Sequence, residues 1–523
     1  MRSILLAAAA ALVPAFALAP VSLAADQPVV AEWPENARHV VVRAFYETDE
    51  QLQNFVARTA PWKVDRRKRY LIVDVDEQQA VALQAGGFRL EIDQARTVEL
   101  NIPASLAGAQ RNGIPGFSCY RTVSETYAAA EALAMAYPDL AAWVDIGDSW
   151  EKTNGFGGAD LMVLRLTNAN TGGDKPALFT TSAIHAREYT TAELNTRFAE
   201  YLLQNYGTDA DVTWLLDYHE IHLMLQANPD GRRQAQTGIL WRKNANQNYC
   251  GAGSQDRGAD LNRNFEYEWG CCNGSSGSQC STVYRGPTPG SEPEVAAIQA
   301  YARSIFDDAR GPNATDAASA DASGVYIDIH SFSELVLWPW GYTPTPAPNG
   351  SALQTLGRRL AWFTGYNPQQ ATELYITDGT TDDFIYGDLG VAAYTYELGT
   401  TFFQDCGTFE STILPDNLPS LVYAAKSARA PYLDPSGPAV VDVSLSPAAV
   451  APGESATLTA TVDDSRFENR NGTEPTQPIA SASFSVDTPL WEDGVSTSAL
   501  SASDGSFNTS SESVTATVDT TGL

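Results

Sequence analysis

The sequence predicts an α/β protein in which a large domain, with a mixed twisted sheet flanked by helices, lies between two smaller units. Three observations support this fold class. Residues 117–431 alternate apolar, β-branched runs with amphipathic helical segments, as in a sheet with helical crossovers. Residues 25–100 contain a shorter α+β pattern. Residues 435–523 lack lysine and are rich in Ser, Thr and Val in period-two segments, which predicts an all-β module.

The first 24 residues have the composition of a secretory signal. Arg2 supplies a positive end, an apolar alanine-rich run follows, and residues 22–24 suit a small-x-small cleavage site. The run is too short and too interrupted by proline for a membrane span, and no later segment is predicted to be one. We therefore expect a secreted or periplasmic protein. Its formal net charge of −30 argues against a nucleic-acid partner, because phosphates would be repelled.

Residues 25–100 are predicted to form the small α+β unit. The strands are expected at VVVRAFY, YLIVDVD and FRLEID, with helices at DEQLQNFVART and QQAVALQAG between them. The basic run KVDRRKR (63–69) is interpreted as a solvated turn before a strand. A linker at 101–116 carries Pro, Gly and small residues, so it is the expected site of proteolytic cleavage.

The large domain at 117–431 contains the strongest strand and helix signals. Strands are predicted at LMVLRLT, ALFTTSAI, EIHLMLQ, VYIDI and VAAYTYE. One helix is predicted at SETYAAAEALAMAY, and another from Ser291, where Ser291 and Glu294 would form a capping box. The polar stretch at 307–324 has no periodicity and is expected to be a loop.

The last segment, 435–523, is predicted to be an immunoglobulin-like β-sandwich. VVDVSLS and SATLTATV alternate with period two and are separated by Pro-Gly turns. One or two further strands would be expected after TATVDTTGL, so the module is predicted either to be incomplete or to end on an exposed edge.

The six cysteines are predicted to form disulfides. Their even number in an exported protein favours this interpretation, and four of them lie between residues 250 and 280. The alternative is a thiolate metal site, but no paired C-x-x-C spacing supports it.

A candidate metal site lies where the strand ALFTTSAI ends on His185. Glu188 follows three residues later, and Thr190 with Glu193 is expected to form a capping box that opens a helix. The carboxyl ends of strands are where open α/β sheets place ligands, and an imidazole beside a carboxylate is half of a zinc site. An H-x-x-E spacing also arises by chance, so this pair alone leaves the structural alternative open.

The sequence contains five histidines, so few residues can supply a further imidazole ligand. His330 ends the strand VYIDI and therefore has the same setting as His185. Together His185, Glu188 and His330 would form a His₂Glu zinc site with one position open for water. His39 lies in the small N-terminal unit, and His219 and His222 are interpreted as structural because, three residues apart on a strand, they face opposite sides.

Six motifs in order carry a resemblance to a known family. They are HAREYTT, NPDG, WRKN, DLNRNF, DIHSFSE and YTYELG. Between residue 117 and about 430 the chain resembles zinc metallocarboxypeptidases of the pancreatic carboxypeptidase A and B family. The resemblance implies the metallocarboxypeptidase fold, one zinc ion, and hydrolysis of the C-terminal peptide bond of peptides and proteins by a zinc-activated water.

The resemblance also assigns roles to residues outside the ligand set. Glu397 matches the general base. Arg242 matches the arginine that stabilises the oxyanion, and Asn262 and Arg263 match the pair that binds the terminal carboxylate.

Three further residues match substrate-contacting positions. Arg187 lies beside the ligands, and Tyr375 matches a mobile tyrosine that closes over the substrate. Asp382 falls seven residues after Tyr375, at the floor of the specificity pocket, although the glycine placement nearby differs from the pancreatic pattern. Aspartate there implies a preference for C-terminal Lys or Arg, with acceptance of apolar residues left open.

The N-terminal unit resembles the family's pro-domain. This implies a zymogen that is inhibited by its own pro-domain. We expect a monomer; calcium is compatible with an acidic exported enzyme but cannot be located. Two alternatives remain open. A deacylase or cell-wall peptide hydrolase can share this fold and zinc site, and a non-catalytic binding protein can share the fold.

Overall fold

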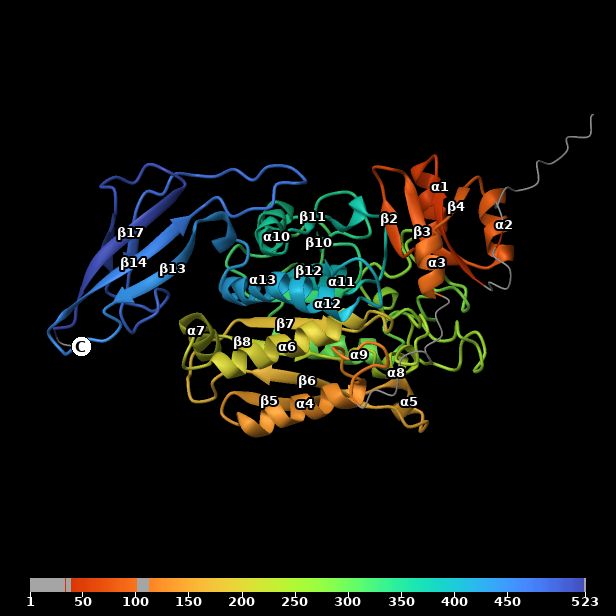
Figure 1. Cartoon of the computed structure of the whole chain (residues 1–523), viewed down its shortest axis with the longest axis horizontal. Coiled ribbons are helices and arrows are strands. Elements are labelled where there is room, and N and C mark those ends of the chain that lie inside the picture. The colour runs from red at the N-terminus through yellow and green to blue at the C-terminus, as the bar shows by residue number, and fades with distance from the viewer. Residues whose placement is uncertain (1–32, 34–38, 101–111, 522–523) are drawn as a thin grey trace, which may run out of the picture.

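The computed structural model describes residue 33 and residues 39–100 and 112–521. The predicted signal at 1–24 and most of the linker at 101–116 lie outside these residues. Figure 1 shows the N-terminal unit and the C-terminal β unit at opposite ends of the large central domain. Among the described residues, no helix combines the length and the apolar character that crossing a membrane requires.

The N-terminal unit is a four-stranded antiparallel sheet with the order β2-β3-β1-β4. Its elements are β1 (Val40–Phe45), α1 (Asp49–Val56), β2 (Lys63–Asp65), β3 (Tyr70–Val75), α2 (Glu77–Ala85), β4 (Arg89–Ile92) and α3 (Gln94–Leu100). The predicted strands and helices are present. The basic run is a turn only in its second half, because its first three residues form β2 and bury Val64 against the sheet.

The central sheet has eight strands in the order β11-β10-β12-β9-β7-β8-β6-β5. Its strands are β5 (Ala141–Asp148), β6 (Asp160–Leu166), β7 (Ala177–Ser182), β8 (Glu220–Met224), β9 (Val325–His330), β10 (Leu335–Trp338), β11 (Asn367–Gln370) and β12 (Ala392–Glu397). The neighbours β8, β7, β9 and β12 run parallel, whereas β5, β6 and β10 pair antiparallel. The predicted mixed sheet is therefore confirmed.

Helices cover both faces of this sheet. They are α4 (Val123–Ala136), α5 (Trp150–Thr153), α6 (Tyr189–Asn205), α7 (Ala210–Tyr218), α8 (Pro229–Ala235), α9 (Pro293–Ile305), α10 (Gly350–Thr364), α11 (Thr381–Leu389), α12 (Cys406–Thr408) and α13 (Leu414–Lys426). The ring of Phe179 contacts Tyr301 of α9, while the next residue, Thr180, donates a hydrogen bond to Asn195 of α6. Successive strand residues point to opposite faces, so α9 and α6 lie on opposite sides.

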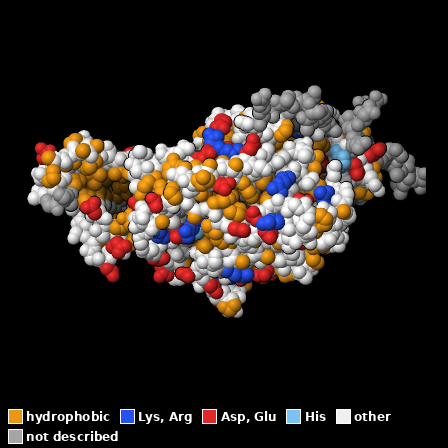
Figure 2. Space-filling model, turned by 90° about the horizontal axis from the view of Figure 1, so that it is seen from below, with side chains coloured by type: hydrophobic (Ala, Val, Ile, Leu, Met, Phe, Trp, Pro, Cys, Tyr) orange, Lys and Arg blue, Asp and Glu red, His pale blue; other side chains and the backbone are white. Residues whose placement is uncertain are grey.

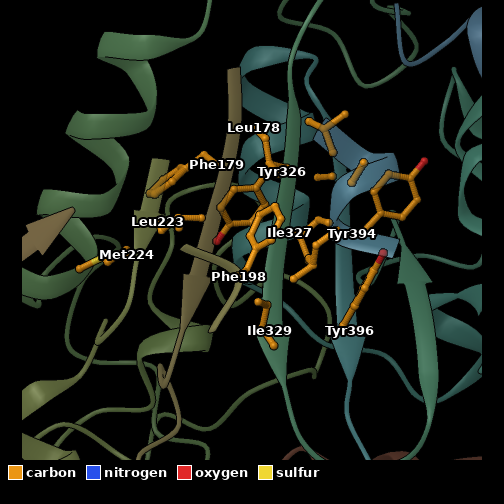
Figure 3. Close-up of a cluster of buried hydrophobic side chains, with 14 of the residues drawn as sticks. Leu178, Phe179, Phe198, Leu223, Met224, Tyr326, Ile327, Ile329, Tyr394 and Tyr396 are labelled. Carbon is orange, nitrogen blue, oxygen red and sulfur yellow. The ribbon is translucent and has the colours of Figure 1, made fainter. Parts of the chain in front are cut away.

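The core of the domain is built from the apolar runs of these strands. Figure 3 shows side chains of β7, β8, β9 and β12 together with Phe198 of α6 in one cluster. Tyr326 and Tyr394 within it are fully buried. This packing fixes the strand ends, and hence the residues that follow them, in a rigid frame.

Both predicted capping boxes are wrong. Helix α6 begins at Tyr189, with Glu188 at its N-cap, and the carboxylate of Glu193 instead accepts from the guanidinium of Arg121 at 3.0 Å. Helix α9 begins at Pro293, and the carboxylate of Glu294 accepts from the backbone N–H of Trp150 at 2.8 Å. In both cases a partner far along the chain takes the carboxylate that the local pattern assigned to a cap.

The C-terminal unit is all-β, as predicted, but its described strands form one sheet rather than the two sheets of the predicted immunoglobulin-like sandwich. Its strands are β13 (Ala439–Ser446), β14 (Ser455–Asp463), β15 (Ala482–Phe484), β16 (Ser498–Ala502) and β17 (Ser511–Asp519), which form one antiparallel sheet in the order β13-β14-β17-β16-β15. The last strand, β17, lies inside the sheet, so the edges are β13 and β15. Figure 2 shows hydrophobic side chains gathered in a hollow of this unit, and Val443 on β13 is 64% exposed.

The six cysteines form three disulfides, which confirms the prediction: Cys119–Cys406, Cys250–Cys280 and Cys271–Cys272. The first joins the start of the central domain to the segment after β12. The other two lie in the long loop region between α8 and α9, which is poor in secondary structure.

Candidate active site

His185 and Glu188 lie in the short turn between β7 and α6. Glu188 occupies the N-cap position of α6, and its Oε1 lies 2.9 Å from Nδ1 of His185. Asn228 stabilises this turn because its side-chain amide donates to the backbone carbonyl of Ile184 at 3.0 Å. Both side chains are buried, so the strand end and the helix start hold them at fixed positions.

His330 ends β9, the strand that pairs with β7 in parallel, so the sheet brings it beside His185. The two Nδ1 atoms are 3.0 Å apart, and Nδ1 of His330 lies 3.2 Å from Oε2 of Glu188. One ligand atom from each of the three residues lies within 4.8 Å of the others. The three predicted ligands therefore converge on one point, where they could hold a metal ion.

The outer nitrogens of both imidazoles face carboxylates. Nε2 of His185 lies 3.2 Å from Oδ1 of Asp260, and Nε2 of His330 lies 2.9 Å from Oδ2 of Asp328. Because a carboxylate accepts, each Nε2 can donate its proton there, which leaves Nδ1, on the side of Glu188, as the nitrogen that would bind a metal. Two imidazole lone pairs and a carboxylate form a donor set that fits zinc.

Sequence reasoning missed these two carboxylates. Asp260 opens the DLNRNF motif, and Asp328 stands two residues before His330. The sequence does contain a signal for Asp328: residues i and i+2 of a strand lie on the same face, so Asp328 and His330 face the same side of the sheet.

The electrostatics keep Glu188 and Asp260 ionised. Burial alone would raise the pKa of Glu188, but the imidazoles of His185 and His330 hold it well below its ordinary value. Burial acts in the same direction on Asp260, but the guanidinium of Arg242 and the imidazole of His185 hold its pKa well below the ordinary range. Glu188 is therefore charged as a metal ligand should be, and Asp260 is charged as a hydrogen-bond acceptor.

Arg242 is fixed by Asp260. Its Nε and Nη2 donate to Oδ2 of that carboxylate at 3.0 and 2.9 Å, and its Nη1 lies 3.4 Å from Nδ1 of His185. The side chain of Arg242 is largely buried, so its guanidinium is an oriented positive group beside the metal donors.

Asn262 and Arg263 lie in a single 3-10 turn (Leu261–Arg263) after Asp260. Oδ1 of Asn262 accepts from the backbone N–H of Thr381 at 2.8 Å, which orients its amide. Arg263 is 4% exposed, and its Nε has no hydrogen-bond partner among the described residues.

Glu397 ends β12 directly beside the end of β9, where it pairs in register with His330. Its partial burial in the cleft raises its pKa to about 8, although the imidazole of His330 opposes the shift. Tyr375 lies in the loop before α11, and Asp382 lies in the first turn of that helix.

All the predicted site residues line a single cleft: His185, Arg187, Glu188, Arg242, Asn262, Arg263, His330, Tyr375, Asp382 and Glu397. Arg187 packs with its guanidinium 4.0 Å from the ring centre of Phe402. Burial and the neighbouring Arg242 lower the pKa of Arg187 to about 10.

The N-terminal unit also lines this cleft, through residues 61–64. The ring of Trp62 lies 5.7 Å from that of Phe402, and its indole N–H donates to Asp74 at 2.9 Å. The side-chain amide of Gln53 donates to the backbone carbonyl of Ile376 and accepts from its N–H, both at 3.1 Å. The resemblance to a pro-domain implies that the two units meet, but no local pattern indicates which side chains make these contacts.

Known proteins are similar to this chain in both sequence and fold. The zinc carboxypeptidase family model matches residues 126–417. A zinc carboxypeptidase of Saccharothrix mutabilis subsp. capreolus is 31% identical over 402 residues, covering 72% of this chain and 85% of that protein. Carboxypeptidase A1 of Rattus norvegicus is 30% identical over 309 residues, covering 57% and 67%.

Two solved structures share the fold. Carboxypeptidase A from Helicoverpa armigera aligns with a TM-score of 0.60 at 23% identity, covering 75% of this chain and 98% of that one. Thrombin-activatable fibrinolysis inhibitor aligns with a TM-score of 0.59 at 22% identity, covering 75% and 99%. With the family model covering more than half of the sequence, the chain belongs to the zinc carboxypeptidase family and is a metallo-exopeptidase.

Proposed function

We propose that the protein is an exported zinc carboxypeptidase, made as a precursor, that removes single residues from peptide C-termini and prefers basic ones. One observation carries this proposal: the metal donors, a strand-end carboxylate and three arginines line the same cleft. A carboxypeptidase needs these groups together, because it must hold a free carboxylate, polarise a peptide carbonyl and move a proton.

The residues divide these tasks. Zinc held by His185, Glu188 and His330 would supply a Lewis acid that polarises the scissile carbonyl. Glu397, at the cleft wall beside His330, takes a proton from the attacking water and gives it to the leaving amine. Arg242, oriented by Asp260, donates to the oxyanion. Such a donor contributes roughly 3–4 kcal/mol at comparable sites.

Recognition of the substrate terminus falls to Asn262 and Arg263. A guanidinium matches a carboxylate with two parallel hydrogen bonds, and the Nε of Arg263 has no partner among the described residues. The amide of Asn262 is held by Thr381 and adds a second donor. Arg187 offers a further positive group on the cleft wall, and Tyr375 can close over the substrate.

Specificity for basic side chains is assigned to Asp382. Asp382 is 4% exposed and lines the cleft. Burial raises the pKa of Asp382, and a bound ammonium or guanidinium group would favour the charged form again. Matched peptides ending in Arg, Leu and Glu test this: Arg should be released fastest, and faster release of Leu would contradict the assignment.

The N-terminal unit is proposed to be the inhibitory pro-domain. Trp62 and its neighbours line the cleft, where they would restrict the entry of a peptide until the unit is removed. The linker at 101–116 is the expected cleavage segment. N-terminal sequencing of the active exported form should give a start within or just after the linker; a start near residue 25 would contradict the proposal.

Export is supported by residues 1–24 and by the three disulfides. The same sequencing experiment, applied to the precursor, should locate the first cut after residue 24.

The reaction class is tested with two peptides that differ only in a free acid or an amide at the C-terminus. The activated enzyme should release the last residue of the acid, stop when a chelator is added, and recover with zinc. Equal cleavage of the amide, or hydrolysis of N-acyl groups instead, would favour a deacylase or a cell-wall peptide hydrolase.

A further inference from the structure

We propose that Asp328 is a positioning residue that orients the zinc ligand His330. The inference rests on the proposed zinc carboxypeptidase function and assigns a role to a residue outside the known motif roles. Asp328 is fully buried directly beneath the site, on β9.

Asp328 is held by three donors from three different elements. Its Oδ1 accepts from the hydroxyl of Thr181 at 2.7 Å, and its Oδ2 accepts from the hydroxyl of Thr381 at 2.6 Å and faces Nε2 of His330 at 2.9 Å. Thr181 is its direct neighbour in the β7–β9 register, and Thr381 opens α11. The carboxylate is therefore a fixed point to which the imidazole is tied.

The position of Asp328 decides which nitrogen of His330 carries the proton. Because the carboxylate can only accept, Nε2 donates, and Nδ1 keeps its lone pair facing Glu188. Without this acceptor the other tautomer becomes available, in which Nδ1 carries the proton and cannot bind zinc.

Asp328→Ala should therefore weaken zinc binding. We expect a loss of zinc affinity of roughly 10–100-fold, the range found when partners of a ligating histidine are removed. Saturating zinc should restore most of the activity, because zinc on Nδ1 of His330 keeps the proton on Nε2.

Two variants separate positioning from folding. Asp328→Asn keeps the shape and an acceptor oxygen, so it should fold normally and lose less zinc affinity than Asp328→Ala. Ile329→Val lies on the same strand but points to the opposite face, into the core, so it should lower stability and leave zinc affinity within about twofold.

Zinc affinity is measured on the full-length protein by competition with a chromophoric chelator. Equal affinity in Asp328→Ala and Ile329→Val would overturn the positioning role. A wild-type chain that binds zinc but releases no C-terminal residue would contradict only the proposed function. A wild-type chain that binds no zinc would contradict both the proposed function and the role of Asp328.

Discussion

At the scale of single residues, the site depends on buried charges that partner one another across the chain. Asp260 connects Arg242 to His185, and Asp328 holds His330, so a carboxylate sets the orientation of each of these three side chains. The sequence identified the ligands because His330 ends a strand and His185 and Glu188 follow one. It did not reveal their carboxylate partners as such, because a hydrogen bond to a histidine depends on the tertiary structure.

Replacing Arg263 with Met tests carboxylate recognition at this scale. The variant loses a charge-assisted hydrogen-bond donor, worth about 2–3 kcal/mol, so kcat/KM for free-acid peptides should fall by roughly 30–150-fold. Steady-state kinetics on the acid and amide pair is the measurement. The discrimination between the two should shrink; unaltered discrimination would show that Arg263 does not bind the carboxylate.

Glu294 makes the stability of the folded protein depend on pH. Burial and the nearby Glu292 raise the pKa of Glu294 to about 8 from its ordinary value of 4.5, and Asp230 adds to the shift. Between these two pH values the folded state holds the proton that the unfolded state has lost, so stability falls as the pH rises through this window. Below pH 4.5 the contribution is fully present.

Glu294→Gln mimics the protonated side chain and should flatten this dependence. The free energy of unfolding of the wild type should drop between pH 5 and pH 8 by an amount on the order of 4 kcal/mol at most, and the variant should show less of the drop. Denaturant unfolding at several pH values measures it. Identical slopes for both proteins would contradict the assignment.

At the scale of elements, long apolar runs proved more predictive than local capping patterns. The five strands predicted in the central domain all lie in its sheet, because a buried strand must be apolar wherever it is placed. Both predicted capping boxes failed because Glu193 and Glu294 have better partners, Arg121 and the backbone of Trp150. A cap competes with tertiary contacts that no local pattern reveals.

Helix α1 offers a matched test of inhibition by the N-terminal unit. Gln53 bonds to Ile376, beside Tyr375, whereas Gln51 on the same helix bonds to Gly86 within its own unit. In the uncleaved precursor, Gln53→Ala should raise peptidase activity severalfold because it loosens the unit over the cleft, and Gln51→Ala should not. Equal activity of both variants and the wild type would argue against this contact.

At the scale of the whole molecule, the C-terminal unit is joined to the central domain by buried charged groups. Arg358 of α10 donates to Glu474 at 2.6 Å and to the backbone carbonyl of Asn471 at 2.8 Å. Its neighbour Arg359 is fully buried, with its guanidinium 3.8 Å from the ring centre of Phe467. Removing the β unit would leave both guanidinium groups without these partners, so we expect the two parts to unfold together.

Glu474→Ala tests this coupling. The variant leaves the buried guanidinium of Arg358 without its carboxylate partner, so it should destabilise the protein by about 3 kcal/mol. The control is Glu266→Ala, which removes the partner of Arg303 from an exposed pair and should cost less than about 1 kcal/mol. Calorimetry measures both; equal small effects would show that the interface contributes little.

The most direct test of the central claim is the activity of Glu397→Gln. The substitution keeps the size of the side chain but removes its ability to take a proton from water, a contribution of roughly 10²–10⁴-fold. We predict that the activated variant binds zinc as the wild type does and loses at least about 10²-fold in kcat for release of a C-terminal arginine. Undiminished kcat with bound zinc would contradict the mechanism.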